Sequence, residues 1–117
     1  MISTEQQFEF LIQEVRKYML EHQAAEQVIV VKTAKGNVRF FANNVLDQKY
    51  VEEKEFVRKL VEQDDTVIQY IVCMWNDESL DLPSMNFRKL LLDVNEENKY
   101  AEIYLGNGVK EIWKCMP

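Results

Sequence analysis

Residues that bind metals are scarce in this sequence, which has one histidine and two cysteines in 117 residues. His22, Cys73 and Cys115 are far apart and form no C-x-x-C or H-x-x-x-H pair. A structural zinc site needs about four nitrogen or sulfur ligands, so the sequence predicts no metal site, and we expect no cofactor. Because the chain shows no export signal, we expect both cysteines to be buried thiols rather than a disulfide.

Glycine and proline are also rare, with three and two copies. The glycine-rich loops that bind phosphates are absent, and Gly106-Asn107-Gly108 is typical of a hairpin turn. A nucleophilic triad needs a base beside its nucleophile. His22 would have to be that base, and it falls at the end of a predicted helix. The expectation is therefore that the chain is not an enzyme.

Long apolar runs are missing as well. The longest, Tyr70 to Trp75, is far shorter than the roughly 20 residues that a membrane-spanning helix needs. The start, Met1-Ile2-Ser3-Thr4-Glu5, has neither the basic nor the apolar region of a signal peptide. We expect a cytoplasmic protein that does not associate with membranes.

Positive charge is in deficit, with 14 Lys and Arg against 20 Asp and Glu and a net charge of −6. Nucleic-acid-binding proteins normally carry a basic surface, so we expect no nucleic-acid partner. Hydrophobic residues make up 47% of the chain and aromatic residues 11%, enough to build a core. The length fits one domain, residues 1–117.

Apolar residues at helical spacing predict three helices. The first covers residues 4–22, and Ser3 or Thr4 begins a capping box. The second covers about 49–63. The third and shortest covers 84–94, with Ser84 as its N-cap. Its three consecutive leucines, Leu90-Leu91-Leu92, are also compatible with a strand.

Alternating apolar residues predict five strands: a hairpin of 28–33 and 38–42, a strand at 66–75, and a hairpin of 100–105 and 109–116. The strand at 66–75 is apolar on both sides, which is typical of a central strand that is covered on both faces. The order α-β-β-α-β-α-β-β indicates an α+β fold: a single domain with a mainly antiparallel sheet of about five strands, two long helices and one short helix. We expect the helices to lie together on one face or edge of the sheet.

Acidic residues are concentrated in the second half of the chain. Residues 1–58 carry a net charge of −1, and residues 59–117 carry −5. Asp64-Asp65 and Asp77-Glu78 should lie about 30 Å apart, at opposite ends of the central strand. The helix at 84–94 is only about 15 Å long, so acids at its two ends can share a surface. The predicted partner-binding residues are Trp75, Asp77, Glu78, Asp81, Asp93, Glu96 and Glu97.

An acidic surface of this kind attracts and neutralises a basic partner. We therefore predict a non-catalytic acidic binding protein that inhibits a basic protein partner. This function is typical of bacterial immunity proteins and antitoxins, whose partner is a toxin domain such as a nuclease. The acidity also has a simpler interpretation, since excess charge on polar loops keeps a small protein soluble.

Other functions remain open on the sequence. The main alternative is a small-molecule-binding or enzymatic α+β domain with an aromatic pocket between sheet and helices. Its lining would be Tyr50, Tyr70, Tyr100, Tyr104 and Trp113, with Glu102 or Glu111 as polar contacts. Another is a homo-oligomer joined through the edge of the last hairpin. Glu52-Glu53-Lys54 and Glu97-Asn98-Lys99 have the spacing of some metal-dependent nucleases, but we interpret them as solvated surface charge.

Overall fold

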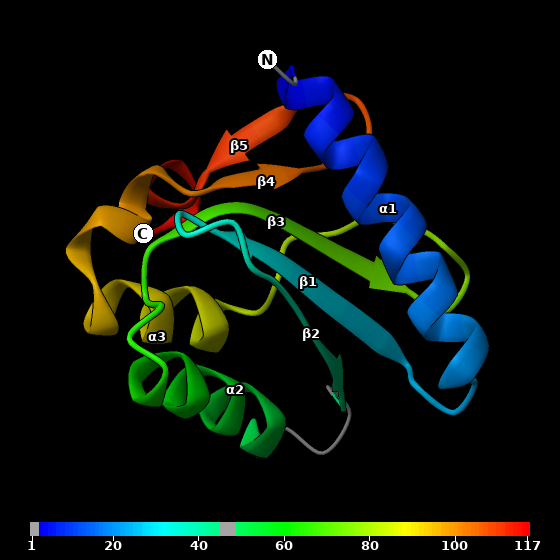
Figure 1. Ribbon diagram of the computed structural model, residues 1–117, viewed down its shortest axis with the longest axis horizontal. Helices are drawn as coiled ribbons and strands as arrows, with labels where there is room; N and C mark the ends of the chain where they lie inside the picture. Colours follow the sequence, from blue (N-terminus) through cyan, green and yellow to red (C-terminus); the bar gives the residue numbers. More distant parts are fainter. Residues whose placement is uncertain (1–2, 45–48) are drawn as a thin grey trace.

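Five strands form one mixed sheet, in the order β2-β1-β3-β4-β5, in the computed structural model, which describes residues 3–44 and 49–117 (Figure 1). β3 and β4 run parallel, and the other neighbouring pairs are antiparallel. The strands are β1 (Gln27–Thr33), β2 (Val38–Asn43), β3 (Ile68–Trp75), β4 (Glu102–Tyr104) and β5 (Val109–Glu111). The predicted element order and the mainly antiparallel five-stranded sheet of a single α+β domain are confirmed.

One face of the sheet is covered by α1 (Thr4–Glu21), which crosses it diagonally in Figure 1. Ser3 caps this helix as predicted: its hydroxyl accepts from the Gln6 N–H at 3.2 Å, and the Gln6 side chain accepts from the Ser3 N–H at 3.0 Å. The apolar stripe of α1 packs on the residues of β1 and β3 that point to this side. The buried members of this cluster are Phe8, Leu11, Val15, Val28, Val30, Val72 and Met74.

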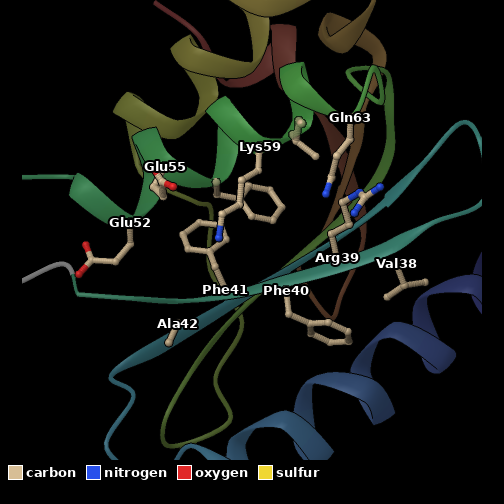
Figure 2. A pocket seen from close by; sticks show the side chains of 11 residues that line it. Val38, Arg39, Phe40, Phe41, Ala42, Glu52, Glu55, Lys59 and Gln63 are labelled. Carbon is tan, nitrogen blue, oxygen red and sulfur yellow. The ribbon is translucent and has the colours of Figure 1, made fainter.

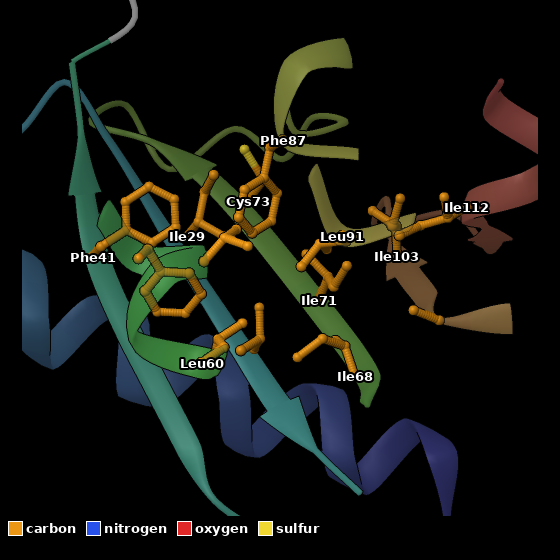
Figure 3. Packing of buried hydrophobic residues seen from close by; sticks show 14 residues of the cluster. Ile29, Phe41, Leu60, Ile68, Ile71, Cys73, Phe87, Leu91, Ile103 and Ile112 are labelled. Atoms are coloured by element: carbon orange, nitrogen blue, oxygen red, sulfur yellow. The ribbon is translucent and has the colours of Figure 1, made fainter. Parts of the chain in front are cut away.

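The opposite face is covered by α2 (Val51–Glu62) and α3 (Met85–Val94). Figure 3 shows Phe41, Phe87 and Leu60 meeting over the strands. Helices on both faces correct the expectation of helices on a single face or edge. The cause is β1, whose residues alternate between the two clusters while both sets are fully buried. A strand that is apolar on both sides needs a helix layer on each.

The last third of the chain differs from prediction at two places. Residues 84–94 are confirmed as a helix capped by Ser84, but a 3₁₀ helix, Glu96–Tyr100, follows. It is fixed by Asn98, whose buried side chain accepts from the Ile68 N–H at 2.8 Å and donates to Leu91 O at 2.8 Å. The predicted strand 109–116 ends at Glu111, where a second 3₁₀ helix, Ile112–Cys115, turns Ile112 into the core.

Both cysteines are free thiols, Cys73 buried and Cys115 partly buried. None of the helices in residues 3–44 and 49–117 combines the length and apolar character that crossing a bilayer requires.

Candidate functional site

The carboxylate of Glu53 is completely buried in the first turn of α2. The Ser84 hydroxyl donates to this carboxylate at 2.8 Å, and the Asn86 amide donates to its Oε1 at 2.9 Å. Asn43, the last residue of β2, donates to Oε2 at 2.8 Å. Glu53 therefore joins the end of β2 to the beginnings of α2 and α3.

The partners of Glu53 are themselves held in place. Ser84 is the N-cap of α3, and its hydroxyl oxygen accepts from the Phe87 N–H at 3.1 Å. Asn43 is 2% exposed and donates a second hydrogen bond to Gln27 Oε1 at 3.0 Å. Hydrogen bonds on each side thus fix these polar side chains, so the cluster is rigid and preorganised.

A hollow of about 340 Å³ lies against Asn43 and is named here the Asn43 pocket. It is formed where the turn before β1, the end of β2 and the start of α2 meet. Its lining residues are His22, Ala24, Ala25, Glu26, Ala42, Asn43, Asn44 and Glu52.

Three buried oxygen atoms of lining residues lack a hydrogen-bond donor: Glu26 Oε2, Asn43 Oδ1 and Glu52 Oε2. Buried polar atoms are nearly always hydrogen-bonded, and an exception requires an explanation. All three atoms of this kind in the described ranges belong to residues of one pocket. All three atoms are buried, so the lack of a donor is a property of the packing around them.

A second hollow, of about 410 Å³, lies between β2 and α2 (Figure 2). Its apolar lining includes Phe41 and Phe56, and its charged lining residues are Arg39, Glu52, Glu55 and Lys59. Two of these already have partners: Arg39 is paired with Asp65 at 3.0 Å, and Glu55 is hydrogen-bonded to Arg58. The second hollow shares Ala42 and Glu52 with the Asn43 pocket, so the two adjoin.

Four of the predicted partner-binding residues lie together at the end of β3. Asp77 accepts from the Ser79 hydroxyl at 2.6 Å and from its N–H at 2.9 Å, and these bonds hold the pKa of Asp77 below its usual range. Glu78 pairs with Arg16 at 2.6 Å. Asp81 accepts from Trp75 Nε1 at 3.1 Å. Local hydrogen bonds and an ion pair thus engage all three acids.

The other three predicted residues lie elsewhere. Asp93 is in the last turn of α3, and Glu96 and Glu97 are in the 3₁₀ helix that follows. This helix is hydrogen-bonded to Ile68, at the beginning of β3. The structure therefore places the two acidic groups at opposite ends of β3 (Figure 1). Whether any of the seven residues binds a partner, and whether that partner is a basic protein, stays a prediction.

The aromatic residues proposed for a pocket do not gather. Tyr70 and Tyr104 pack against Phe8 beneath α1, with ring centroids 5.2 and 5.0 Å away. Tyr100 and Trp113 are 60% and 50% exposed. Tyr50 precedes α2.

The interpretation of Glu52-Glu53-Lys54 as solvated surface charge is wrong for Glu53, which is completely buried. The missed signal is its position three, four and seven residues before Phe56, Val57 and Leu60, all of which are buried. Residues at these spacings share one helix face, so Glu53 had to point into the protein.

No family model and no curated protein matches the chain. Its fold is similar to the crystal structure of cytidine deaminase from Mycobacterium tuberculosis, with a TM-score of 0.63 and 17% identity over 78% of this chain and 75% of that one. It is also similar to cytidine deaminase from Mycobacterium leprae, with a TM-score of 0.60 and 14% identity over 78% and 77% of the two chains. Identities this low show a common fold.

This similarity overturns the prediction of a non-catalytic inhibitor of the immunity-protein or antitoxin type. The expectation that the chain is not an enzyme is corrected with it, because cytidine deaminases are enzymes. The prediction was wrong because it rested on net charge, which reports on solubility and association but not on fold. The alternative, a small-molecule-binding or enzymatic α+β domain, is better supported.

Proposed function

We propose that this protein has a function of the small-molecule-binding class: it binds a small polar molecule in the Asn43 pocket. The observation that carries the proposal is the hollow of about 340 Å³ against Asn43, a buried residue whose Oδ1 has no hydrogen-bond donor. Ligand pockets use a few well-placed polar groups to orient their ligands. The similarity to deaminases supports the proposal, because those proteins act on a small molecule.

The zinc-ligand pattern of zinc-dependent deaminases shows whether this chain could share their mechanism as well as their fold. They hold zinc through a His or Cys two residues before a catalytic Glu, and through both cysteines of a Pro-Cys-x-x-Cys segment. In this chain, Glu53 stands two residues after Val51, and Pro83 is followed by Ser84 and Phe87 at the cysteine positions. This chain therefore has a glutamate at the position of the catalytic Glu, but Val51, Ser84 and Phe87 stand at the three zinc-ligand positions.

The structure shows that these positions do not fit a zinc ion. Val51 is 58% exposed, and Phe87 is packed in the core beside Phe41 and Phe56. Neither side chain has a ligand atom. The Ser84 hydroxyl is hydrogen-bonded to Glu53 and caps α3. We therefore propose no zinc-dependent step.

Cys73 does not replace the missing ligands. It is buried in β3, and burial strongly raises the pKa of its thiol, with the acidic groups of Asp81 and Glu53 adding to the effect. Metal binding needs the thiolate. Among the described residues, no group of His, Cys, Asp and Glu side chains is arranged to hold a metal ion.

Positioning is the role that the contacts of Glu53 support. Its carboxylate receives hydrogen bonds from Asn43, Ser84 and Asn86 and has no exposed surface. It therefore orients the amide of Asn43 from behind rather than contacting a ligand itself. The residues that would contact the ligand are those of the pocket wall: Glu26, Asn43 and Glu52.

Filling the pocket tests the proposal. In Ala24→Phe, a large side chain is introduced at an exposed turn residue of the pocket rim. Ala34→Phe is the matched control, because Ala34 is also an exposed turn residue but does not line the pocket. Both variants and the wild type are titrated with nucleobases, nucleosides and small amines, and ¹⁵N–¹H NMR follows the amides of residues 24–27.

We expect at least one compound to shift these resonances in the wild type and in Ala34→Phe. The same compound should bind Ala24→Phe at least about tenfold more weakly, a difference of roughly 1.4 kcal/mol. Binding that is unchanged in Ala24→Phe, or an absence of binding by every compound, would contradict the proposed function.

A further inference from the structure

The outer edge of β2 is open along its length. β2 is the first strand in the sheet order, so β1 is its only partner strand in the described part of the chain. Within residues 3–44 and 49–117, the main chain of residues 38–42 makes no hydrogen bond besides those to β1. A strand edge with unpaired N–H and C=O groups is a template for one more strand.

The register of the sheet identifies the main-chain groups of β2 that face outward. The Thr33 N–H donates to Asn37 O at 2.9 Å beside the hairpin turn. Because bonded pairs alternate along an antiparallel ladder, residues 31, 29 and 27 of β1 are bonded to residues 39, 41 and 43 of β2. The bond from the Asn76 N–H to Glu26 O, on the β3 side of β1, agrees with this pattern. The N–H and C=O groups of residues 38, 40 and 42 therefore point away from β1.

The second hollow, of about 410 Å³, lies along this open strand and is bounded on its other side by α2. Figure 2 shows that α2 runs in the direction opposite to β2. Ala42 and Glu52 lie at one end of the hollow, and Arg39 and Gln63 lie at the other. This space, named here the β2 groove, thus joins an unpaired strand edge to a helix beside it.

An extended peptide segment fits this geometry. Strand addition combines main-chain hydrogen bonds to an open edge with pockets for alternate side chains of the peptide. In an antiparallel segment, the residues opposite positions 42, 40 and 38 bond to β2, and their side chains point toward α1, as Phe40 does (Figure 2). The residues opposite positions 43, 41 and 39 point toward α2 and enter the groove.

A second copy of this chain fits the groove less well. Its β2 would have to insert the side chains of residues 39, 41 and 43. Phe41 is only 8% exposed beneath its own α2, and Asn43 is 2% exposed and bonded to Glu53. Arg39 is paired with Asp65 at 3.0 Å. These side chains are used within the copy's own fold, whereas those of a free peptide are available to fill the groove.

The charges along the β2 groove favour one order of residues in the peptide. Glu52 and Glu55 line the end near residue 42, and Lys59 lies one turn further along α2. Lys59 forms no ion pair within the described ranges, and Figure 2 shows its side chain reaching from α2 toward β2. A segment antiparallel to β2 passes the two glutamates first and then reaches Lys59 and Arg39. A basic residue followed by an acidic one therefore complements the groove.

We propose that this protein binds an extended peptide segment as an additional antiparallel strand on β2. The segment places a basic, an apolar and an acidic side chain in the β2 groove, at positions i, i+2 and i+4, opposite residues 43, 41 and 39. This interaction is independent of the small-molecule function proposed for the Asn43 pocket, and it adds a peptide partner.

N-methylated peptides test strand addition on the full chain. The parent is a capped peptide with the core Lys-Thr-Leu-Thr-Glu-Thr. N-methylation of its first two threonines removes the N–H groups that donate to the C=O groups of residues 42 and 40, and should weaken binding at least about tenfold. The matched control is methylated at the leucine and the glutamate, whose N–H groups point away from β2, and should bind within about threefold of the parent.

Hydrogen exchange followed by ¹⁵N–¹H NMR locates the peptide. The amides of residues 38, 40 and 42 should exchange more slowly in the complex, while those of residues 39 and 41, which are already bonded to β1, should change little. Equal binding of the two methylated peptides, or no binding of the parent, would overturn the proposal. Protection of residues 38, 40 and 42 without peptide, together with a dimer in sedimentation equilibrium, would show that a second copy occupies the edge instead.

Exchanging the charges tests the order of residues. The peptide Glu-Thr-Leu-Thr-Lys-Thr has the same composition as the parent and should bind about threefold more weakly. Lys59→Glu should remove this preference. Lys54→Glu introduces the same change at an exposed residue of α2 outside the groove and should preserve it. A preference that is absent in the wild type, or unchanged in Lys59→Glu, would contradict the charge match. An unperturbed NMR spectrum away from α2 is the folding control for both variants.

Discussion

Two buried carboxylates lie near opposite ends of β2, and their partners differ. Asp65, 2% exposed, accepts from Arg39 Nε at 3.0 Å and from Asn37 Nδ2 at 2.9 Å, at the beginning of the strand. Glu53, at the other end, accepts from neutral amides and a hydroxyl: those of Asn43, Asn86 and Ser84.

Asp65 forms an ion pair with Arg39, and its charge is fully compensated by neighbouring groups. Burial raises the pKa of Asp65, but hydrogen bonds from Asn37, Thr33 and Arg39 outweigh it and hold that pKa below its usual range. The charge of Asp65 is thus compensated within the fold. At the other end of β2, three acceptors beside Glu53 have no donor. The first carboxylate therefore belongs to an ion pair that is complete within the fold, whereas the second lies beside Asn43, whose Oδ1 has no donor.

Removing the charge of Asp65 should have the largest effect. In Asp65→Asn, the new amide faces the donors of Asn37 and Arg39 and leaves the Arg39 charge uncompensated. Breaking such a pair costs about 3 kcal/mol of unfolding free energy, reduced here to about 2–3 kcal/mol because water reaches Arg39. Urea denaturation measures it. Asp64→Asn is the control, since the ion pair between the fully exposed Asp64 and the largely exposed Lys35 is worth little. Equal losses in the two variants would contradict a structural role for the pair of Asp65 with Arg39.

The same pair predicts a pH dependence. Because the folded-state pKa of Asp65 is depressed, its stabilising contribution is present above the unfolded-state pKa, about 4, and is lost as the pH falls through the folded-state value. The stability gap between wild type and Asp65→Asn should therefore be constant near pH 7 and should narrow below about pH 4. Denaturation curves from pH 7 to pH 2 test this. A gap that stays constant to pH 2 would show that Asp65 does not titrate as an ion-paired carboxylate.

A smaller loss is expected at Glu53. In Glu53→Gln, an N–H₂ group replaces one carboxylate oxygen among donors from Asn43, Ser84 and Asn86, so one buried hydrogen bond is lost and two donors face each other. This costs about 1–2 kcal/mol. Thermal denaturation measures the loss, and affinity for a ligand of the Asn43 pocket should fall as well because the orientation of Asn43 is no longer fixed. Unchanged affinity would show that Glu53 does not position Asn43.

Local patterns predicted most of the fold. The N-caps Ser3 and Ser84, the helical stripes and the alternation of β1 and β3 are short-range features, so the element order followed from them. The apolar pattern of the strand at 66–75 predicted cover on both of its faces, and the placement of all helices on one face or edge was wrong because Val28 and Ile29 of β1 also point to opposite sides. The 3₁₀ helix at Glu96–Tyr100 depends on Asn98 reaching Ile68 and Leu91. Such distant contacts leave no periodic signal.

The candidate site was not predictable in the same way. Its members Glu26, Asn43 and Glu52 come from three elements and have no motif spacing, so only the folded chain brings them together. Acidic residues are numerous along the sequence, with 20 Asp and Glu, so their number does not distinguish the few that are buried. The decisive property of the site is a lack of donors around three oxygens, which is a property of three-dimensional packing.

The smallest expected change in unfolding free energy is a gain rather than a loss, and it concerns Glu52, at the same end of β2 as Glu53. Glu52→Gln removes a charge whose buried Oε2 lacks a donor, and relief of such a group is worth about 1–2 kcal/mol. Against this, Glu52 lies in the first turn of α2, where a negative charge favours the helix by about 0.3–1 kcal/mol. The variant should therefore be more stable than the wild type by about 0.5 kcal/mol, a gain typical of residues kept for binding rather than stability. Urea denaturation alongside Glu53→Gln gives the comparison between neighbours. A loss above about 1 kcal/mol in Glu52→Gln would mean that the fold itself satisfies this carboxylate, and the case for a ligand at the pocket would lose its main support.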